Sequence, residues 1–317
     1  MQSSDALLAC PRCAGPLVAL RCDACPEQYA APGGIPALRL PADERTDRVR
    51  NFYAQAPFPG YPARDSLSAL RERASRSAFA RSLDAALPGD ASVAEMGCGT
   101  GQLSLFLASA DRIVVGADLT RPSLELAQDA AERLGVEGVR FVETDLHAPG
   151  LRRQAFDAVI CTGVLHHTPD PRASFAAVAD LVRPGGVLVV GVYNAVARLP
   201  LRARRQIARL TGYRWVPGDP VLAERQGEPA RRRAWLRDQY QHVEEHRHTL
   251  GEVRSWFRAS GFTYLRTFPS TLFGGETNEL FAQEDDWAVE RAVAQLAWMR
   301  SLGSEGGLFV AVGAKPC

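Results

Sequence analysis

Short apolar runs alternate with amphipathic stretches through the middle of the chain. The apolar runs predict strands at 92–96, 112–117, 139–143, 156–162 and 187–193. The stretches between them have helical periodicity and predict helices at 102–110, 120–134 and 173–182. Because parallel strands are joined through helices, this alternation predicts a parallel sheet with helices on both faces.

The pattern is less regular on both sides of this region. Ahead of it, residues 66–87 predict a helix capped by Ser66, whereas the aromatic and proline-rich residues 51–61 predict an ordered loop. After it, helices are predicted at 196–210, 229–240, 252–260 and 285–301, and strands at 262–268 and 308–312. The break in alternation after residue 193 indicates a helical insertion before the last strands.

The composition is that of a globular protein. Hydrophobic residues make up 46% and charged residues 23% of the 317 residues, and the net charge is +1. This balance argues against a disordered chain and against a strongly basic nucleic-acid binder. The best apolar run, 186–192, is far shorter than the roughly 20 residues of a membrane-spanning helix, and the N-terminus lacks a secretory pattern. We therefore expect no membrane partner and a cytoplasmic location.

A glycine-rich turn joins the predicted strand 92–96 to the following helix. Residues 95–101 read EMGCGTG, and glycine at 97, 99 and 101 lets the backbone turn tightly and approach a ligand. Amide groups of the turn and the helix N-terminus then face that ligand. The spacing differs from the dinucleotide-binding fingerprint, because Gln102 occupies its last glycine position.

Two acidic residues lie at the ends of the next two predicted strands. Asp118 ends VVGAD, and Asp145 ends VRFVETD. The first acid is placed to accept hydrogen bonds from both hydroxyls of a ribose, and the second from an exocyclic adenine amine. Since carboxyl ends of parallel strands meet at one edge of the sheet, these groups predict an extended nucleoside ligand there.

Five motifs in this order resemble those of class I S-adenosylmethionine (SAM)-dependent methyltransferases. They lie between about residues 90 and 193 and read EMGCGTG, VVGADLT, FVETDLH, FDAVICTGVLHHTPDP and LVRPGGVLVVGVYN. The resemblance implies SAM as cofactor and an α/β fold. That fold is a doubly wound, mostly parallel seven-stranded Rossmann-like sheet with a reversed last strand, for which 308–312 is the candidate.

The resemblance also implies roles for individual residues. Those implied at the methionine end of SAM are Glu95, Gly97, Cys98, Gly99 and Gly101. Those implied at the ribose and adenine are Asp118, Leu119, Asp145 and Leu146. Those implied on the sulfonium side are Cys161, Thr162 and Gly163.

Methyl transfer is an in-line displacement at an activated carbon, so the protein mainly positions the acceptor and removes its proton. Residues 163–171 (GVLHHTPDP) follow the fourth strand, where the acceptor is expected. His166 and His167 are adjacent and point in different directions in most backbones, so one is a candidate general base and the other a structural residue. Aromatic faces would stabilise the sulfonium by cation–π attraction, and the candidates are Phe52, Tyr53 and Tyr193.

A second group of candidates lies at 238–253, which contains three of the six histidines. His242 and His246 are four residues apart and would share one face of a helix. A polar loop, a substrate-facing lid that carries a base, and a metal site are the three interpretations. The arginine-rich segment 198–237, with eleven arginines against three acids, is either a solvated face or a site for an anionic partner such as RNA.

Four of the seven cysteines form two CxxC pairs, Cys10 with Cys13 and Cys22 with Cys25. Two such pairs place four thiolates within tetrahedral reach of one structural zinc ion, which would supply the ordering free energy that so short a segment lacks. Two redox pairs are the alternative, but no thioredoxin-like unit surrounds them. The segment resembles the zinc ribbon that precedes the methyltransferase domain in some bacterial methyltransferases, including an rRNA guanine methyltransferase.

These features predict a zinc ribbon at 1–40, a linker and helical cap at 41–90, and a methyltransferase domain at 91–317 with a helical insertion at about 194–250. The leading hypothesis is a SAM-dependent methyltransferase of a small molecule. The ribbon and the arginines favour an RNA methyltransferase as the alternative, although CTGV stands where an NPPY-like motif for base-amine methylation would lie. A third hypothesis, a non-catalytic adaptor, leaves the intact glycine turn and both acids without a role.

Overall fold

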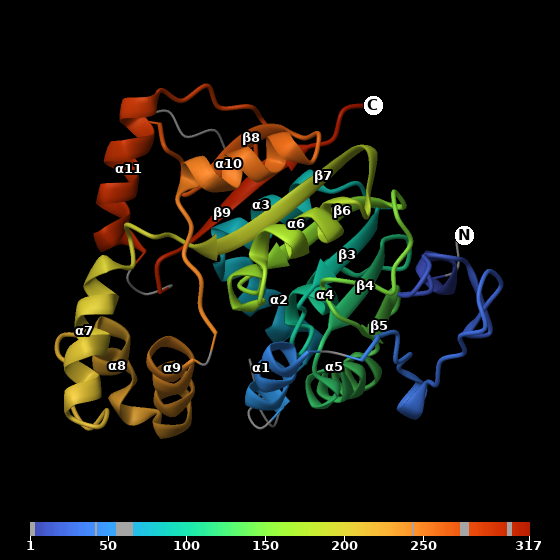
Figure 1. Ribbon diagram of the computed structural model, residues 1–317, viewed down its shortest axis with the longest axis horizontal. Helices are drawn as coiled ribbons and strands as arrows, with labels where there is room; N and C mark the ends of the chain where they lie inside the picture. Colours follow the sequence, from blue (N-terminus) through green and yellow to red (C-terminus); the bar gives the residue numbers. More distant parts are fainter. Residues whose placement is uncertain (1–3, 42, 55–65, 243, 273–278, 303–305) are drawn as a thin grey trace.

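A seven-stranded sheet forms the centre of the computed structural model (Figure 1). The structure describes residues 4–41, 43–54, 66–242, 244–272, 279–302 and 306–317. In the order β5-β4-β3-β6-β7-β9-β8, the strands are β5 (Val139–Glu143), β4 (Ile113–Asp118), β3 (Ser92–Met96), β6 (Phe156–Thr162), β7 (Val182–Tyr193), β9 (Leu308–Ala314) and β8 (Thr263–Phe268). The neighbours from β5 to β7 are parallel, whereas β9 is antiparallel to both β7 and β8. The predicted mostly parallel sheet with a reversed last strand is therefore confirmed.

The strand order defines where a ligand is expected. The chain runs outward from β3 through β4 to β5, then returns to the other side of β3 with β6 and β7. The connections on either side of β3 and β6 therefore diverge, and a crevice forms at the carboxyl ends of these two strands.

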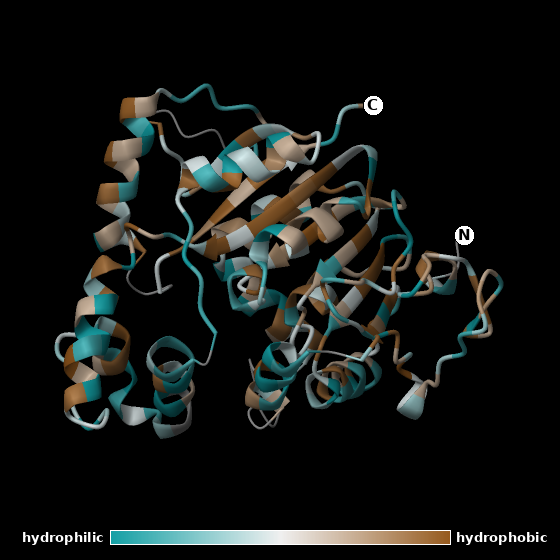
Figure 2. Ribbon diagram, viewed as in Figure 1, coloured by the Kyte–Doolittle hydropathy of each residue, from teal (hydrophilic) through white to brown (hydrophobic). Residues whose placement is uncertain are grey.

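Two helical layers cover the sheet, and successive strand residues face opposite layers. On β6, Val159 belongs to the hydrophobic cluster that contains α6 and α10 residues, and Ile160 to the cluster that contains α3 and α4 residues. The first layer includes α6 (Pro171–Ala179) and α10 (Leu250–Ala259). The second includes α2 (Leu67–Arg76), α3 (Ala78–Ala86), α4 (Gln102–Leu107) and α5 (Arg121–Leu134). Because both faces are buried, the strands are apolar along their length, as the brown colour of the central strands shows (Figure 2).

The N-terminal segment is fixed to the edge of the sheet at β5. It contains the 3-10 helices η1 (Ser4–Leu7) and η2 (Pro32–Gly34) and the short hairpin β1 (Leu17–Val18) with β2 (Arg21–Cys22). The backbone amide of Leu38 donates to the carbonyl of Glu143 at 2.8 Å, and that of Ala9 to Gly150 at 3.0 Å. Leu7 and Leu38 are fully buried in the main hydrophobic cluster. The N-terminal segment that contains the cysteines is thus packed against the sheet.

The remaining helices lie around one end of the sheet. They are α1 (Glu44–Ala54), α7 (Leu199–Leu210), α8 (Pro220–Glu224), α9 (Pro229–Gln241) and α11 (Ala288–Ser301), with short 3-10 turns η3 (Leu165–His167) and η4 (Arg225–Gly227). Helices α7 to α9 form a group below α11, and α1 lies beside α9 (Figure 1). None of the helices in the described part of the chain has the length and apolarity that a bilayer span requires.

Several predicted elements differ from the structure. Residues 51–54, predicted as loop, are the last turn of α1, because a helix begins at Glu44 and buries Thr46 and Val49; the other residues of that predicted loop lie outside the described part. The predicted helix 66–87 is two helices, because Ser77 has an extended backbone and caps α3 by accepting from the Ala80 amide. The predicted helix 102–110 ends at Leu107, and the fifth strand begins at Val182 instead of residue 187.

Candidate functional site

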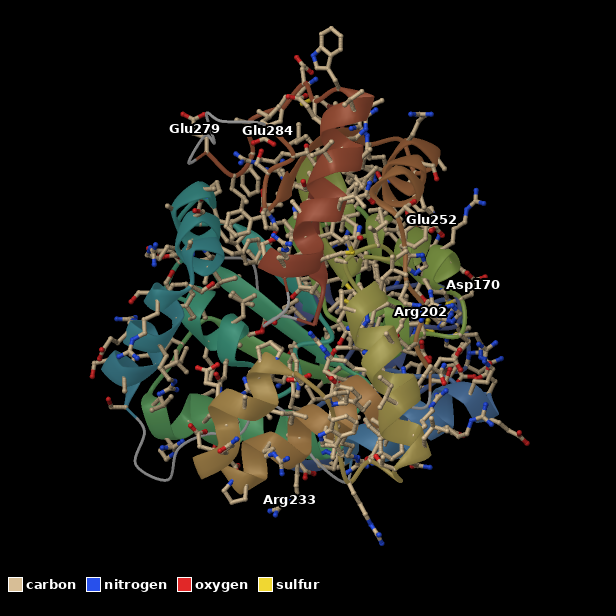
Figure 3. All side chains as sticks on the ribbon, turned by 90° about the vertical axis from the view of Figure 1, so that its left-hand side faces the viewer. Asp170, Arg202, Arg233, Glu252, Glu279 and Glu284 are labelled. Atoms are coloured by element: carbon tan, nitrogen blue, oxygen red, sulfur yellow. The ribbon has the colours of Figure 1, made fainter. Side chains whose placement is uncertain are left out.

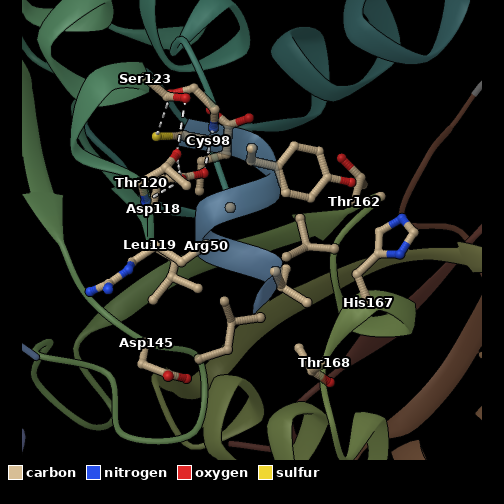
Figure 4. A pocket seen from close by; sticks show the side chains of 18 of the residues that line it. Arg50, Cys98, Asp118, Leu119, Thr120, Ser123, Asp145, Thr162, His167 and Thr168 are labelled. Carbon is tan, nitrogen blue, oxygen red and sulfur yellow. Dashed lines mark hydrogen bonds between the residues drawn. The ribbon is translucent and has the colours of Figure 1, made fainter. Parts of the chain in front are cut away.

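A cavity of about 440 Å³ lies at the carboxyl ends of the central strands and extends to α1 and α9 (Figure 4). The residues predicted to bind SAM that line it are Glu95, Gly97, Cys98, Gly99, Asp118, Leu119, Asp145, Leu146, Thr162 and Gly163. Two others do not line it. Gly101 is the N-cap residue of α4, and Cys161 is fully buried in the core because it faces the α6 side of β6.

The glycine turn has the backbone that its sequence predicts. Gly97 has φ of +77°, and a Cβ atom there would overlap the side chain of Val164 on the opposite wall. Gly101 has φ of +75°, and its Cβ would lie 2.8 Å from the ring of Phe141. Another residue at either position would strain the backbone and collide with a neighbour, so the turn can approach a ligand only with glycine.

Asp118 clamps this turn to the end of β4. One carboxylate oxygen accepts the Gly99 amide at 2.8 Å, and the other accepts the amide and hydroxyl of Thr120 at 2.8 and 2.6 Å. Burial raises the pKa of Asp118, although these hydrogen bonds favour its ionised form. A carboxylate has about four lone-pair positions, so one remains for a ligand hydroxyl.

Glu95 is a buried carboxylate at the end of β3. It accepts a hydrogen bond from the hydroxyl of Ser104 on α4. Burial raises its pKa from 4.5 to about 7. A carboxylate so poorly solvated gains strongly from a cationic partner, which suits it to an ammonium group.

Asp145 interacts with His147, which was not among the residues predicted from the sequence. The backbone amide of His147 donates to Asp145 at 2.9 Å, and the His147 Nδ1 atom lies 3.1 Å from the same oxygen. The neighbouring carboxylate raises the pKa of His147. Since both residues line the cavity, this end of it is polar and partly charged.

His167 lines the opposite wall of the cavity from Asp118 (Figure 4). Its Nδ1 atom lies 2.8 Å from the carbonyl oxygen of Glu244, which can only accept. The proton of the neutral ring is therefore on Nδ1, and Nε2 carries a lone pair. Burial lowers the pKa of His167 to about 3, so the ring is neutral near pH 7.

Three side chains from distant segments meet beside His167. The hydroxyl of Tyr53 on α1 donates to Asp238 on α9 at 3.1 Å, and that of Tyr193 on β7 donates to the other oxygen of Asp238 at 3.5 Å. The amide of Gln239 donates to Tyr193 at 2.7 Å and to Asp238 at 2.6 Å. Tyr53, Tyr193 and Asp238 all line the cavity. Phe52, the other aromatic candidate, instead packs under the guanidinium of Arg237 and does not line it.

The other histidine candidates lie behind the wall. His166 is fully buried against the Tyr193 ring, with 3.7 Å between ring centroids, and neither of its ring nitrogens has a hydrogen-bond partner among the described residues. His242 stacks on His167 at 3.7 Å and lies 3.1 Å from the Tyr53 hydroxyl. Its Nδ1 accepts the Glu244 amide, so Nε2 carries the proton that it donates to Tyr53. These two rings can support the site but do not line it.

The expectation that His242 and His246 share a helical face is wrong. His242 follows the last residue of α9, and residues 244–248 are not helical. His248 instead bridges Asn194, the residue after β7, and donates its amide to the Tyr193 carbonyl at 2.9 Å. His246 instead lies 3.1 Å from a carboxylate oxygen of Glu244, outside the cavity.

His167, Asp238 and His242 offer one possible metal-binding group, since their ligand atoms lie within 4.8 Å of one another. However, the two imidazole rings are stacked with only 27° between their planes, so their nitrogens do not converge on one point. The Nε2 atom of His242 is also occupied by Tyr53. We therefore interpret these three residues as a hydrogen-bonded network.

The four N-terminal cysteines have the geometry of a metal site. The Sγ–Sγ distances are 3.6 Å for Cys10–Cys25, 3.4 Å for Cys13–Cys22 and 3.5 Å for Cys13–Cys25. Four thiolates about 2.3 Å from a tetrahedral zinc ion lie about 3.8 Å apart, whereas a disulfide requires about 2.05 Å. The Tyr29 hydroxyl lies 3.0 Å from Cys10 Sγ, where it can donate to a ligating thiolate. The donor set therefore fits one zinc ion.

Asp238 is the main site residue that sequence reasoning missed. It directly follows the arginine-rich segment 198–237 and begins the stretch 238–253, in which the histidines were the candidates. One signal was present, because Asp238 is the only acid on α9 and the preceding turns of that helix are strongly basic. An isolated acid among arginines is a candidate for a specific partner.

Residues 94–190 match a protein-family model described as a methyltransferase domain. This part of the chain is similar to methyltransferase domains. The matched residues include the glycine turn, both strand-end acids and His167. The domain thus provides one side of the cavity, whereas Tyr53 and Asp238 lie outside it.

Individual relatives agree with this match. A ubiquinone biosynthesis O-methyltransferase of Paracidovorax citrulli is 36% identical over 112 residues, which are 35% of this chain and 47% of that protein. An uncharacterized protein of Synechococcus sp. is 29% identical over 290 residues, 80% of this chain and 69% of that protein. The chain therefore matches only about half the length of the named methyltransferase.

The fold also has solved counterparts. The magnesium protoporphyrin IX methyltransferase of Synechocystis PCC 6803, determined with bound S-adenosylhomocysteine (SAH), superposes with a TM-score of 0.50 at 18% identity. The superposition covers 86% of this chain and all of that one. At this identity the similarity concerns the fold, a Rossmann-like methyltransferase sheet.

Proposed function

We propose that this protein transfers a methyl group from SAM to a small-molecule acceptor that carries a hydroxyl or amine. One observation supports this most strongly: a single cavity joins the glycine turn and the strand-end carboxylates to the cluster of His167, Tyr53 and Asp238. The first half is suited to a nucleoside with an amino-acid tail, and the second to an acceptor. The O-methyltransferase name of the relative from Paracidovorax citrulli is in line with a small-molecule acceptor.

In this proposal the chain holds SAM with residues of the methyltransferase domain. Glu95 and the glycine turn bind the methionine end, Asp118 binds the ribose, and Asp145 with Leu146 borders the adenine. Thr162 and Gly163 lie towards the sulfonium. When bound, SAM supplies a methyl group on a positively charged sulfur, which makes the carbon electrophilic.

His167 and Asp238 act on the acceptor. Both present hydrogen-bond acceptors, an imidazole Nε2 lone pair and a carboxylate, so they select a group that donates hydrogen bonds over a phosphate or carboxylate. His167 accepts a hydrogen bond from the acceptor O–H or N–H and orients its lone pair in line with the methyl carbon. When the acceptor is methylated, the proton that it loses would pass to the Nε2 lone pair of His167, while Nδ1–H stays bonded to the Glu244 carbonyl.

The central test of the proposal is cofactor binding. Titration calorimetry with SAM and SAH should give saturable binding to the full chain at micromolar concentrations. No heat at millimolar SAM would overturn the proposal. Transfer of labelled methyl groups to a panel of phenols, catechols and primary amines then tests the acceptor class, and transfer to total RNA but to none of the panel would favour the RNA alternative.

Replacing His167 with alanine should lower kcat by about 10²- to 10³-fold, the usual contribution of a positioned general base. The dissociation constant for SAM should change less than about threefold, because His167 faces the acceptor half. His246→Ala is the matched control, since that ring contacts Glu244 outside the cavity. Equal loss of activity in both variants would show that His167 acts only by supporting the fold.

We also propose that Cys10, Cys13, Cys22 and Cys25 hold one structural zinc ion, on the strength of their near-tetrahedral spacing. Elemental analysis of the purified chain should give one zinc per molecule. Cys13→Ala should lose it, and Cys317→Ala, which removes another exposed thiol, should retain it. Zinc retained in full by the Cys13 variant would contradict the assignment.

A further inference from the structure

The outer face of α11 is apolar although it is exposed. Every exposed residue between positions 288 and 297 is apolar, and Val289, Val293 and Leu296 recur at helical spacing. Leu296 is 54% exposed, and Trp287, just before the helix, is 77% exposed. The inner face buries Ala294 and Trp298 in the main core, so α11 has apolar residues on its exposed side as well as on its buried side. A water-facing side of this kind is unusual for a surface helix and marks an interaction site.

Helix α7 continues this face. Its exposed apolar residues Leu199, Ile207 and Leu210 lie on one side, and Leu210 is 89% exposed. At about 100° per residue, Arg202 and Arg209 lie together along one edge of that side. The helix sequence, LPLRARRQIARL, has no acid. Neither Arg202 nor Arg209 forms an ion pair with a carboxylate in the part of the chain that the structure describes.

The two helices form one surface. They lie one above the other at the same edge of the molecule (Figure 1) and both face the viewer when that edge is turned forward, with Arg202 on α7 (Figure 3). The side-chain amide of Asn194, just before α7, donates to Gln295 of α11 at 3.1 Å. This hydrogen bond joins α11 to the segment that lies just before α7. We call Trp287, Val289, Val293, Leu296, Leu199, Ile207, Leu210, Arg202 and Arg209 the α7/α11 face.

We propose that the α7/α11 face docks onto an anionic lipid surface. The expectation of no membrane partner rested on the lack of an apolar run long enough to span a bilayer, and docking at the surface requires no such run. An apolar strip edged by arginines on α7, a helix without an acid, and ending in a tryptophan is the arrangement that places a helix in a membrane interface. There the apolar side chains leave water, and the guanidinium groups meet anionic headgroups. The first turn of α11 holds one acid, Glu290, whose carboxylate accepts the Trp287 amide at 2.8 Å.

Two other occupants fit less well. A second copy of the chain, docked by the same face, would bring Arg202 and Arg209 of both copies into one interface, and α7 itself supplies no acid to pair with them. RNA would satisfy the arginines but would leave Leu210, Leu296 and Trp287 without an apolar partner. An anionic lipid surface matches both the charge and the apolar area.

Vesicle flotation of the full chain tests this proposal. Vesicles of phosphatidylcholine with phosphatidylglycerol should bind the protein, and vesicles of phosphatidylcholine alone should bind it at least tenfold more weakly. Binding should weaken as salt rises, because the arginine contribution is screened. Equal binding to both vesicle types, or none to either, would overturn the proposal.

Three variants separate the contributions. Leu210→Glu and Leu296→Glu should each lower vesicle binding more than about tenfold, since each replaces an apolar side chain that would leave water in the lipid by a charged one. Leu126→Glu is the matched control, an exposed leucine on α5, and should bind as the wild type does. Replacing Arg202 and Arg209 together with glutamine should weaken binding to anionic vesicles by roughly fivefold per residue.

The competing occupants predict different results. A dimer in solution that Leu296→Glu dissociates would overturn the proposal in favour of self-association. RNA binding that the double arginine variant loses and Leu210→Glu keeps, without vesicle binding, would overturn it in favour of RNA. Circular dichroism and SAM titration of each variant report folding, and none of these residues contacts the cavity.

Discussion

Replacing Asp118 with alanine is expected to weaken SAM binding at least a hundredfold. The variant loses the acceptor for a ribose hydroxyl and three hydrogen bonds, one from Gly99 of the glycine turn and two from Thr120, that hold the turn at the end of β4. Each hydrogen bond to a charged group contributes about 1.5–3 kcal/mol, so the loss of two or more exceeds a factor of one hundred. Calorimetric titration with SAM measures the change.

Asp129→Ala is the matched control for this variant, because it removes an exposed carboxylate from α5 and leaves the turn intact. The SAM affinity of Asp118→Asn should lie between those of Asp118→Ala and Asp129→Ala, since the remaining oxygen of the amide can still accept a hydrogen bond from Thr120 or Gly99. An affinity of Asp118→Ala within a few-fold of wild type would remove the basis for placing the ribose at β4. This result would favour the hypothesis that the protein is a non-catalytic adaptor.

Replacing Glu95 with glutamine is expected to stabilise the SAM-free protein at pH 8 and to weaken SAM binding. Burial raises the pKa of Glu95 from 4.5 to about 7, so the ionised carboxylate is the unfavourable form in the folded state. A pKa difference of this size corresponds to about 3 kcal/mol in the free energy of unfolding. The amide keeps the shape and can still accept from Ser104 without carrying a charge.

The pH dependence follows from the sign of this shift. The folded protein binds the Glu95 proton more tightly than the unfolded chain, so the stability from this group is complete below pH 4.5. It is lost as pH rises through about 7. The glutamine variant does not lose this stability. Its free energy of unfolding should therefore begin to exceed that of the wild type between pH 4.5 and 7, and the difference should reach its maximum above pH 7.

Urea unfolding of wild type and Glu95→Gln at several pH values measures this difference, with the exposed Glu125→Gln on α5 as control. SAM affinity at pH 8 should fall at least tenfold, because the ammonium of the methionine end loses its carboxylate. No gain in stability at pH 8 would mean that Glu95 is better solvated than its burial indicates. Unchanged SAM affinity would place the methionine end elsewhere.

The acceptor half of the cavity depends on contacts between α1 and α9. Besides the Tyr53–Asp238 hydrogen bond, Arg237 donates to the Phe52 carbonyl at 2.7 Å, and Arg45 pairs with Glu244. These contacts join the segment before the methyltransferase domain to the insertion after β7. Acceptor specificity is therefore expected to vary with these two segments, whereas the SAM half depends on the sheet.

Local sequence determined the central sheet and its ligand edge. Strands buried on both faces require continuous apolar runs, and a turn at positive φ requires glycine, so β3 to β7, the turn at Gly97 and the carboxylates of Asp118 and Asp145 were predictable. Helix α1 was not predicted, because its sequence ERTDRVRNFYA has few apolar residues and the prolines after it indicated a loop. Helix 66–87 was predicted without its break, which depends on one serine that caps the second part.

Only the tertiary structure decided which candidates meet in the cavity. Adjacent His166 and His167 have the same local chemistry, and the carbonyl of Glu244, 77 residues away, selects His167 as the ring on the cavity wall. Likewise, His248 bridges Asn194 after β7, residues 244–248 form no helix, and His246 does not share a helical face with His242. Tyr53 and Asp238 lie 185 residues apart and meet only because α1 and α9 pack at the same edge of the sheet. Hydrogen bonds and packing over such separations leave no periodic pattern in the sequence, whereas strand burial and glycine turns do.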